Sequence, residues 1–191
     1  MLVVLADANV LYSRVLRDYL LYAADQKVIA IAWSPSILPE VTEHLERNVA
    51  GFDVAAGRRL TLAMNRAFPF AGIEPSAEHQ RLLDELLTAR VLPDEGDRHV
   101  LVAVVASEAT VLCTSITKDF PADIMEILHV EVLTPDELFS RLIAEFELRM
   151  LAAHRAAVTS LKGATDRSTI EALHRAGATT TAGLMSRLLL S

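Results

Sequence analysis

Four acidic residues stand where the sequence pattern ends a strand or begins a helix, and their type and setting could support chemistry. They are Asp7, Glu40, Asp97 and Asp119. If these positions converge in one pocket, four ionised carboxylates repel one another unless divalent cations lie between them. Mg²⁺ and Mn²⁺ suit such a set, because they bind carboxylate oxygens and keep waters for a substrate. The residues therefore point to metal-dependent phosphodiester chemistry.

Each carboxylate also has a purely structural interpretation. Asp7 follows a buried apolar run, where α/β proteins bind ligands, but it is equally suited to cap the next helix. Glu40 borders the apolar stripe of its helix and faces either a cleft or solvent. Asp97 lies in the acidic first turn of a very apolar helix, where it complements the helix dipole or holds a metal. Asp119 is either a turn residue or a ligand at a strand's carboxyl end.

Several other kinds of site are disfavoured by the sequence. The six histidines show no close pairing with each other or with a second cysteine, which argues against zinc. The single cysteine, Cys113, cannot form an internal disulfide and is expected to be a small buried residue. The chain has no Gly-x-x-x-x-Gly-Lys-Ser/Thr loop, no Gly-x-Gly-x-x-Gly and no Gly-x-Ser-x-Gly. Their absence removes most nucleotide-binding folds and the serine-hydrolase elbow.

The elements that must position the four acids alternate between short apolar runs and amphipathic segments. Strands are expected at 2–6, 28–32, 110–114 and 129–133, and helices at 9–25, from Pro35, 53–68, 76–90, 94–106 and 134–158. Ser34 is the expected N-cap before Pro35, and Thr134 and Glu137 form a capping box. Residues 68–73 are ambiguous between strand and loop. This alternation predicts a three-layer α/β fold, followed by two short helices separated at Gly163 and Gly177.

Composition predicts a soluble chain with an uneven distribution of charge. The chain has 191 residues, 52% of them hydrophobic, enough for one core with a small appendage. It has no apolar run of about 18 residues and no leader-like N-terminus, so we expect it to be cytoplasmic and not membrane-bound. Residues 1–148 carry 12 Lys and Arg against 23 Asp and Glu, and residues 149–191 carry 6 against 2. The basic tail suits a polyanionic partner, docking on the acidic body, or a mixed solvated helix.

Four motifs in the chain resemble a known family. They are Ala6-Asp7-Ala8-Asn9-Val10-Leu11-Tyr12-Ser13, then Trp33-Ser34 with Glu40, then Leu92-Pro93-Asp94 running into Asp97-Arg98-His99-Val100-Leu101, and Thr114 leading to Lys118-Asp119-Phe120-Pro121. In this order they resemble the VapC-type toxin branch of the PIN-domain nucleases, over roughly residues 2–140. Residues 146–191 resemble the helical extension carried by one group of these toxins.

The resemblance implies a fold, an activity and partners. The fold is an α/β/α sandwich around a parallel sheet in residues 1–145, with a small helical extension in residues 146–191. The activity is endonucleolytic cleavage of RNA, with Mg²⁺ or Mn²⁺ held by Asp7, Glu40, Asp97 and Asp119. The implied partners are a small antitoxin protein that blocks the acidic pocket and, commonly, a second copy of the chain in a homodimer.

Residues around the pocket are expected to meet the substrate. Arg17, Arg98 and His99 are candidates for RNA phosphates, although Arg17 also suits a plain helix surface, and Thr114 and Ser115 supply hydroxyls.

Two positions depart from the pattern of the family. Gly96 stands where an acidic residue is common, which weakens a second metal position. Ile116 replaces a common asparagine, which removes a polar group near the substrate.

Two other functions remain open from the sequence. The departures at Gly96 and Ile116 are compatible with a PIN-like module that binds RNA or a protein without turnover. A metal-dependent phosphatase or DNA nuclease on a similar sheet differs only in substrate.

Overall fold

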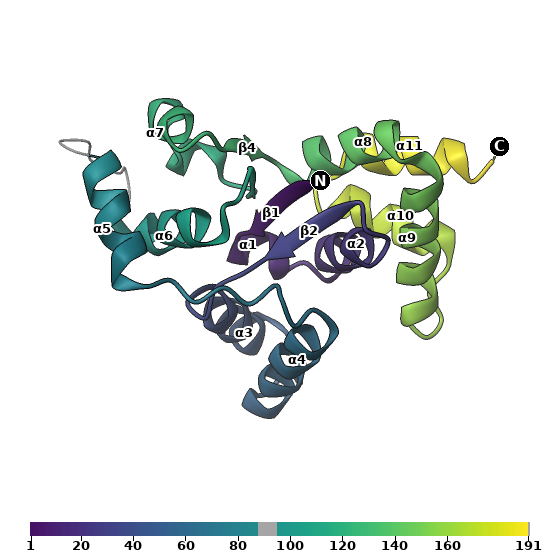
Figure 1. Cartoon of the computed structure of the whole chain (residues 1–191). Coiled ribbons are helices and arrows are strands. Elements are labelled where there is room, and N and C mark those ends of the chain that lie inside the picture. The colour runs from purple at the N-terminus through teal and green to yellow at the C-terminus, as the bar shows by residue number, and fades with distance from the viewer. Residues whose placement is uncertain (88–94, 191) are drawn as a thin grey trace.

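A four-stranded parallel sheet lies at the centre of the fold (Figure 1). The computed structural model describes residues 1–87 and 95–190. The strands are β1 (Leu2–Ala6), β2 (Ile29–Ala32), β3 (Val111–Cys113) and β4 (Glu131–Leu133), in the order β2-β1-β3-β4. Strands alternate with helices along the chain, so the predicted α/β class is confirmed. The all-parallel sheet is consistent with an α/β/α sandwich.

The sheet order brings the ends of β1 and β3 together. From β1 the chain passes to β2 on one side, and later to β3 and β4 on the other, so the direction of winding changes between β1 and β3. Ala6 pairs with Cys113, and the Asp7 N–H donates to the Cys113 carbonyl at 3.0 Å. Both strands are buried at these ends, as expected for continuous apolar runs in a parallel sheet. Asp7 and Thr114 therefore emerge side by side at a switch point, where such folds bind ligands.

The helices of the first half follow the predicted pattern with shifted ends. They are α1 (Ala8–Leu11), α2 (Arg14–Asp25), α3 (Ile37–Asn48), α4 (Val54–Ala67), α5 (Ala77–Leu86), the 3₁₀ turn η1 (Glu95–Asp97) and α6 (Arg98–Ser107). The single helix predicted from Asn9 is broken at Tyr12 and Ser13. Helix α3 begins two residues after Pro35, and its N-cap is Ser36 rather than the predicted Ser34, although Ser34 accepts the Ile37 N–H through its hydroxyl and its carbonyl. Asp94, the predicted start of the apolar helix, lies outside the described residues.

The second half contains one helix that was not predicted and one that is interrupted. Its elements are the 3₁₀ turn η2 (Thr117–Asp119), α7 (Ala122–Ile127), α8 (Pro135–Glu145), α9 (Glu147–Ser160), α10 (Asp166–Arg175) and α11 (Thr179–Leu188). The capping box of Thr134 and Glu137 is confirmed, but the helix it starts ends at Phe146 instead of continuing to 158. No helix in residues 1–87 and 95–190 is long and apolar enough to cross a bilayer.

The tail helices share the hydrophobic core of the body. Met150, Leu173 and Met185 belong to the same buried cluster as the central strands. Helices α9 and α10 lie beside α2, and α11 lies along α8 (Figure 1). Glycines with positive φ, Gly163 at 80° and Gly177 at 85°, turn the chain before and after α10, as their spacing predicted. The chain thus bends at Phe146, close to the expected boundary, while the core continues across it.

A series of polar contacts through buried side chains also links the tail helices to the body. The Tyr19 hydroxyl lies 2.5 Å from His154 Nδ1, and His154 Nε2 lies 3.1 Å from an Asp166 carboxylate oxygen. The side chains of Tyr19 and His154 are completely buried. Because an ionised carboxylate can only accept, His154 donates from Nε2 to Asp166, and Nδ1 of the neutral imidazole accepts from the Tyr19 hydroxyl. The three residues come from α2, α9 and α10 and fix the packing of these helices.

Candidate active site

The four acidic residues singled out in the sequence line one small cavity. Asp7 follows β1, Glu40 lies in the first turn of α3, Asp97 precedes α6, and Asp119 ends η2. The cavity has a volume of about 200 Å³, and its other lining residues are Ala8, Asn9, Tyr12, Ile116 and Phe120. Residues up to 112 positions apart therefore meet at the carboxyl edge of the sheet, because Asp7 and Asp119 leave neighbouring strands there.

Asp7 is the most constrained member of the set. One carboxylate oxygen accepts the Ala8 N–H at 2.7 Å, which makes Asp7 the N-cap of α1. The other accepts from the Thr114 hydroxyl at 2.8 Å and from the Asn9 amide. Asn9 also accepts the Ser115 N–H at 2.8 Å and so links the loops that follow β1 and β3. The capping and the pocket-lining interpretations of Asp7 are thus compatible, since both oxygens are held while the residue faces the cavity.

Burial controls the acidity of Asp7. Only 7% of the residue is exposed, and this burial raises the pKa of its carboxyl above the usual value. Hydrogen bonds from Thr114, Ala8 and Asn9, together with the charge of His99, oppose the rise without cancelling it. A carboxylate in this environment favours a bound cation, because a nearby positive charge would offset the cost of its desolvation.

Glu40 faces His99 across the cavity rim. His99 Nε2 lies 3.1 Å from a Glu40 carboxylate oxygen, although the angle between them does not meet hydrogen-bond geometry. The two side chains are therefore within ion-pair distance, but they are not aligned for a hydrogen bond. His99 Nδ1 lies 2.7 Å from the Gly96 carbonyl oxygen and donates to it, because a carbonyl oxygen can only accept. Burial raises the pKa of Glu40, the charge of His99 lowers it, and Asp7 adds to the rise.

The donor set fits a hard divalent cation by its chemistry. Four carboxylates and the Asn9 amide oxygen provide the oxygen ligands that Mg²⁺ and Mn²⁺ prefer. No three His, Cys, Asp or Glu side chains within residues 1–87 and 95–190 already form a group that could hold a metal ion.

Two arginines predicted to contact substrate lie elsewhere. Arg17 is buried in α2, does not line the acidic cavity, and donates through Nη1 to the Leu11 carbonyl at 2.6 Å. It satisfies the carboxyl end of the short helix α1, a role created by the break at Tyr12 and Ser13. Arg98 forms an ion pair with Asp84 of α5, which directs its charge away from the cavity. The substrate-contact prediction therefore has no support from the position of either residue.

The remaining predicted residues lie at or beside the site. Thr114 is completely buried and supports Asp7, while Ser115 is exposed and contacts Asn9 through its backbone. Ile116 lines the cavity with an exposed apolar side chain. This is the position at which the resembling family commonly has asparagine.

One lining residue of the cavity, Tyr12, belongs to an aromatic pair that was not predicted from the sequence. The rings of Tyr12 and His44 stack with centroids 3.8 Å apart and planes 3° apart. Tyr12 lines the cavity, and His44 lies one helical turn beyond Glu40 on α3. The i, i+4 spacing of Glu40 and His44 was the available signal, since such residues share a helix face. Burial, with the charges of Glu40 and Asp7, raises the pKa of the Tyr12 hydroxyl.

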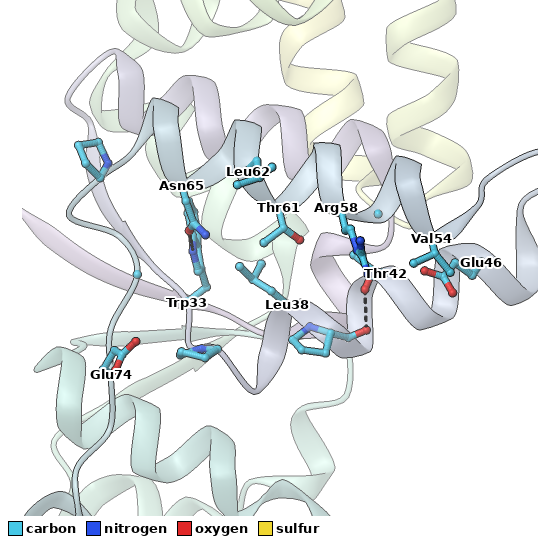
Figure 2. A pocket seen from close by; sticks show the side chains of 15 residues that line it. Trp33, Leu38, Thr42, Glu46, Val54, Arg58, Thr61, Leu62, Asn65 and Glu74 are labelled. Atoms are coloured by element: carbon cyan, nitrogen blue, oxygen red, sulfur yellow. Dashed lines mark hydrogen bonds between the residues drawn. The ribbon is translucent and has the colours of Figure 1, made fainter.

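A larger cavity lies on another side of α3. It has a volume of about 740 Å³ and runs between α3 and α4, where Trp33, Leu38 and Leu62 give it an apolar lining (Figure 2). The Trp33 indole N–H donates to the Asn65 side-chain oxygen at 2.9 Å at one end of this groove. None of the four acidic residues lines it. Helix α3 therefore presents Glu40 to the acidic cavity and Leu38 to the groove.

Comparison of the chain with protein-family models, with curated proteins and with solved structures gives no match.

Proposed function

We propose that the chain is a metal-dependent endoribonuclease. The observation that carries the proposal is the shared cavity of Asp7, Glu40, Asp97 and Asp119 at the carboxyl edge of a parallel sheet. The order of the four motifs, which resembles PIN-domain nucleases, supplies the assignment to RNA. The motif order by itself does not require four side chains that are distant in sequence to face one cavity. The shared cavity therefore adds support that the motifs alone do not give.

The metal would be held by the four carboxylates. A bound Mg²⁺ or Mn²⁺ supplies a more acidic water and neutralises charge that develops on a phosphate. Asp7 is the anchor of the set, since three donors from Ala8, Asn9 and Thr114 hold its two oxygens. The low exposure of Asp7 strengthens its attraction for a cation, because fewer waters screen the charge.

Residues at the rim have separate tasks in this proposal. The His99 imidazole, 3.1 Å from a Glu40 carboxylate oxygen, holds Glu40 at the rim. The flat face of Tyr12, backed by His44, offers a surface on which a nucleobase of a single strand can stack. Lys118 is exposed next to Asp119 and supplies a cation for a backbone phosphate.

We also propose that the protein is the toxin of a toxin-antitoxin pair in the cytoplasm. The motif resemblance is the support for this step, and it extends to a homodimer and to a small antitoxin protein that covers the acidic cavity. Co-expression with a short neighbouring gene product, followed by purification as a complex that no longer cleaves RNA, would support it. A neighbouring product that neither binds nor inhibits the chain would count against that pair.

The activity is tested by incubating the purified chain with single-stranded RNA, single-stranded DNA and a small phosphomonoester. We expect internal cleavage of RNA with Mg²⁺ or Mn²⁺, none with EDTA, and none by a folded Asp7→Asn variant. Cleavage that survives EDTA or Asp7→Asn would refute the proposal. RNA binding without cleavage at any metal concentration would instead favour a non-catalytic module, and preference for DNA or the monoester would change the substrate class.

A further inference from the structure

A third cavity, lined by cations, lies between the first turn of α2 and the tail helices. It has a volume of about 610 Å³, and its charged lining residues are Arg14, Lys162, Arg175 and Asp18. Asp18 is 3.4 Å from Arg14 and pairs with it, so Lys162 and Arg175 give the lining its net positive charge. We name this space the basic tail cavity.

Backbone groups add to the positive character of the basic tail cavity. The lining includes Ser13, the N-cap of the twelve-residue helix α2, and Arg14 and Val15 of its first turn. The N–H groups of a first turn lack partners within the helix and favour anions. Gly163 and Ala164, between α9 and α10, also line the cavity and leave room for a ligand because they are small.

The basic tail cavity adjoins the acidic one along the chain. Tyr12 lines the acidic cavity, and Ser13, the next residue, lines the basic tail cavity. Consecutive Cα atoms are about 3.8 Å apart, so the break between α1 and α2 contributes lining residues to both cavities. In the proposal below, an RNA strand with a phosphate near the four carboxylates continues past Tyr12 into the basic tail cavity.

The two arginines predicted to contact the substrate add no positive charge to the lining of the acidic cavity. Arg17 is buried against Leu11 and Arg98 is paired with Asp84, so neither lines the acidic cavity. The body carries a large excess of acidic residues, whereas the tail after residue 148 has 6 Lys and Arg against 2 Asp and Glu. Repulsion between the acidic body and RNA must be offset somewhere, since binding of nucleic acid is dominated by phosphate contacts.

We propose that the basic tail cavity binds the phosphate backbone of the RNA strand whose scissile bond lies in the acidic cavity. This inference rests on the proposed ribonuclease function and gives the tail a specific role in it. Lys162 and Arg175 are the phosphate contacts, and the first turn of α2 supports them. Phosphate contacts carry no sequence information, so the tail holds the strand without selecting its bases.

The test compares two double variants of the full-length chain. Lys162→Ala/Arg175→Ala removes two cations from the basic tail cavity, and Arg155→Ala/Arg187→Ala removes two exposed tail cations that do not line it. The pairs are matched, because Arg175 and Arg187 each lie in the last turn of a tail helix. Affinity for a labelled single-stranded RNA is measured in EDTA, which prevents metal-dependent cleavage, across a series of salt concentrations. Circular dichroism and thermal melting verify that both variants fold.

We expect the Lys162→Ala/Arg175→Ala variant to bind more weakly than the control pair and to depend less on salt. Loss of two phosphate contacts lowers the magnitude of the slope of log K against log salt by about 1.4 for a single strand. Equal affinities and equal slopes for the two folded variants would overturn the inference.

Cleavage assays separate this inference from the proposed function. If the wild type cleaves RNA but the two double variants bind RNA equally well, the tail contact is refuted and the ribonuclease proposal is retained. Binding that depends on Lys162 and Arg175, with no cleavage by the wild type in Mg²⁺ or Mn²⁺, would remove the ribonuclease and leave a tail that binds RNA.

Discussion

The hydroxyl of Thr114 donates to the Asp7 carboxylate at 2.8 Å, although 107 positions separate the two residues in sequence. This donor lowers the pKa of Asp7 against the effect of burial. Thr114→Val keeps the shape of the side chain but removes the donor. Hydrogen bonds to charged groups contribute about 1.5–3 kcal/mol, so we expect the acid limb of the pH–rate profile for RNA cleavage to move to higher pH. Thr114→Ser keeps the hydroxyl and the wild-type profile, whereas an unchanged profile in Thr114→Val would contradict this role.

Metal binding should stabilise the folded chain through the acidic residues. At a free concentration of Mg²⁺ or Mn²⁺ near 100 times its dissociation constant, the gain in unfolding free energy is about 2.7 kcal/mol. We expect Asp7→Asn and Glu40→Gln to lose this gain in thermal melts. Glu43→Gln is the control, because Glu43 lies on the same helix but pairs with Arg47 at 3.0 Å. Equal metal responses in all three variants would exclude the proposed ligands.

The metal response should depend on pH in a defined direction. Burial raises the pKa of both Asp7 and Glu40, so protons compete with the cation for these oxygens as pH falls. The metal-induced rise in melting temperature should be complete above the raised pKa values and disappear as pH falls through them. Melts at fixed metal concentration over a pH series measure this, and a response that grows on acidification would contradict it.

Without metal, the contribution of Asp7 to folding stability should change with pH in the opposite direction. Its folded pKa lies above the reference value of 3.8, so the folded chain binds the proton more tightly than the unfolded chain. The stability that Asp7 contributes is present below pH 3.8 and is lost as pH rises from there through the raised folded value. Melts in EDTA of the wild type and of Asp7→Asn should therefore diverge as pH rises through this window. Parallel curves would show that Asp7 does not titrate as described.

Tyr12 should contribute to RNA binding through its ring. Stacking of a base on an aromatic side chain contributes about 1–3 kcal/mol. We expect Tyr12→Ala to raise KM for RNA by about tenfold, at about 1.4 kcal/mol per factor of ten, while Tyr12→Phe retains binding because it keeps the ring. Cleavage kinetics of the three proteins measure the effect, and a Tyr12→Phe variant as weak as Tyr12→Ala would assign the role to the hydroxyl instead.

His154 should make the stability of the tail packing sensitive to acid. Burial lowers the pKa of this imidazole, although Asp166 opposes the effect. The unfolded histidine takes up a proton near pH 6.5 while the folded one does not, so stability is lost as pH falls below about 6.5. His154→Gln should flatten the dependence of melting temperature on pH between 7 and 5, and the exposed His174→Gln should not. Identical slopes for His154→Gln and the wild type would contradict the effect.

The elements with strong local signals were predictable from the sequence. The apolar run before Asp7 was expected to be a buried parallel strand, and the capping box of Thr134 and Glu137 was expected to begin a helix. Such signals depend on residues within a few positions, so they can be recognised without knowing the fold. By contrast, the helix breaks at Tyr12 and Phe146 were not predicted, because the apolar pattern of the sequence continues through both positions. They depend on the packing of α2 and α9 against each other and against the core.

The sequence by itself determined which acidic residues stand at strand ends and helix starts, because strand and helix termini have short-range chemical signatures. Only the tertiary structure decided that these residues share one cavity, that Arg17 and Arg98 lie away from it, and that Tyr12 stacks on His44. These outcomes depend on the sheet order and on contacts between distant segments, and the direction of a long side chain is set by the partners that folding brings within its reach.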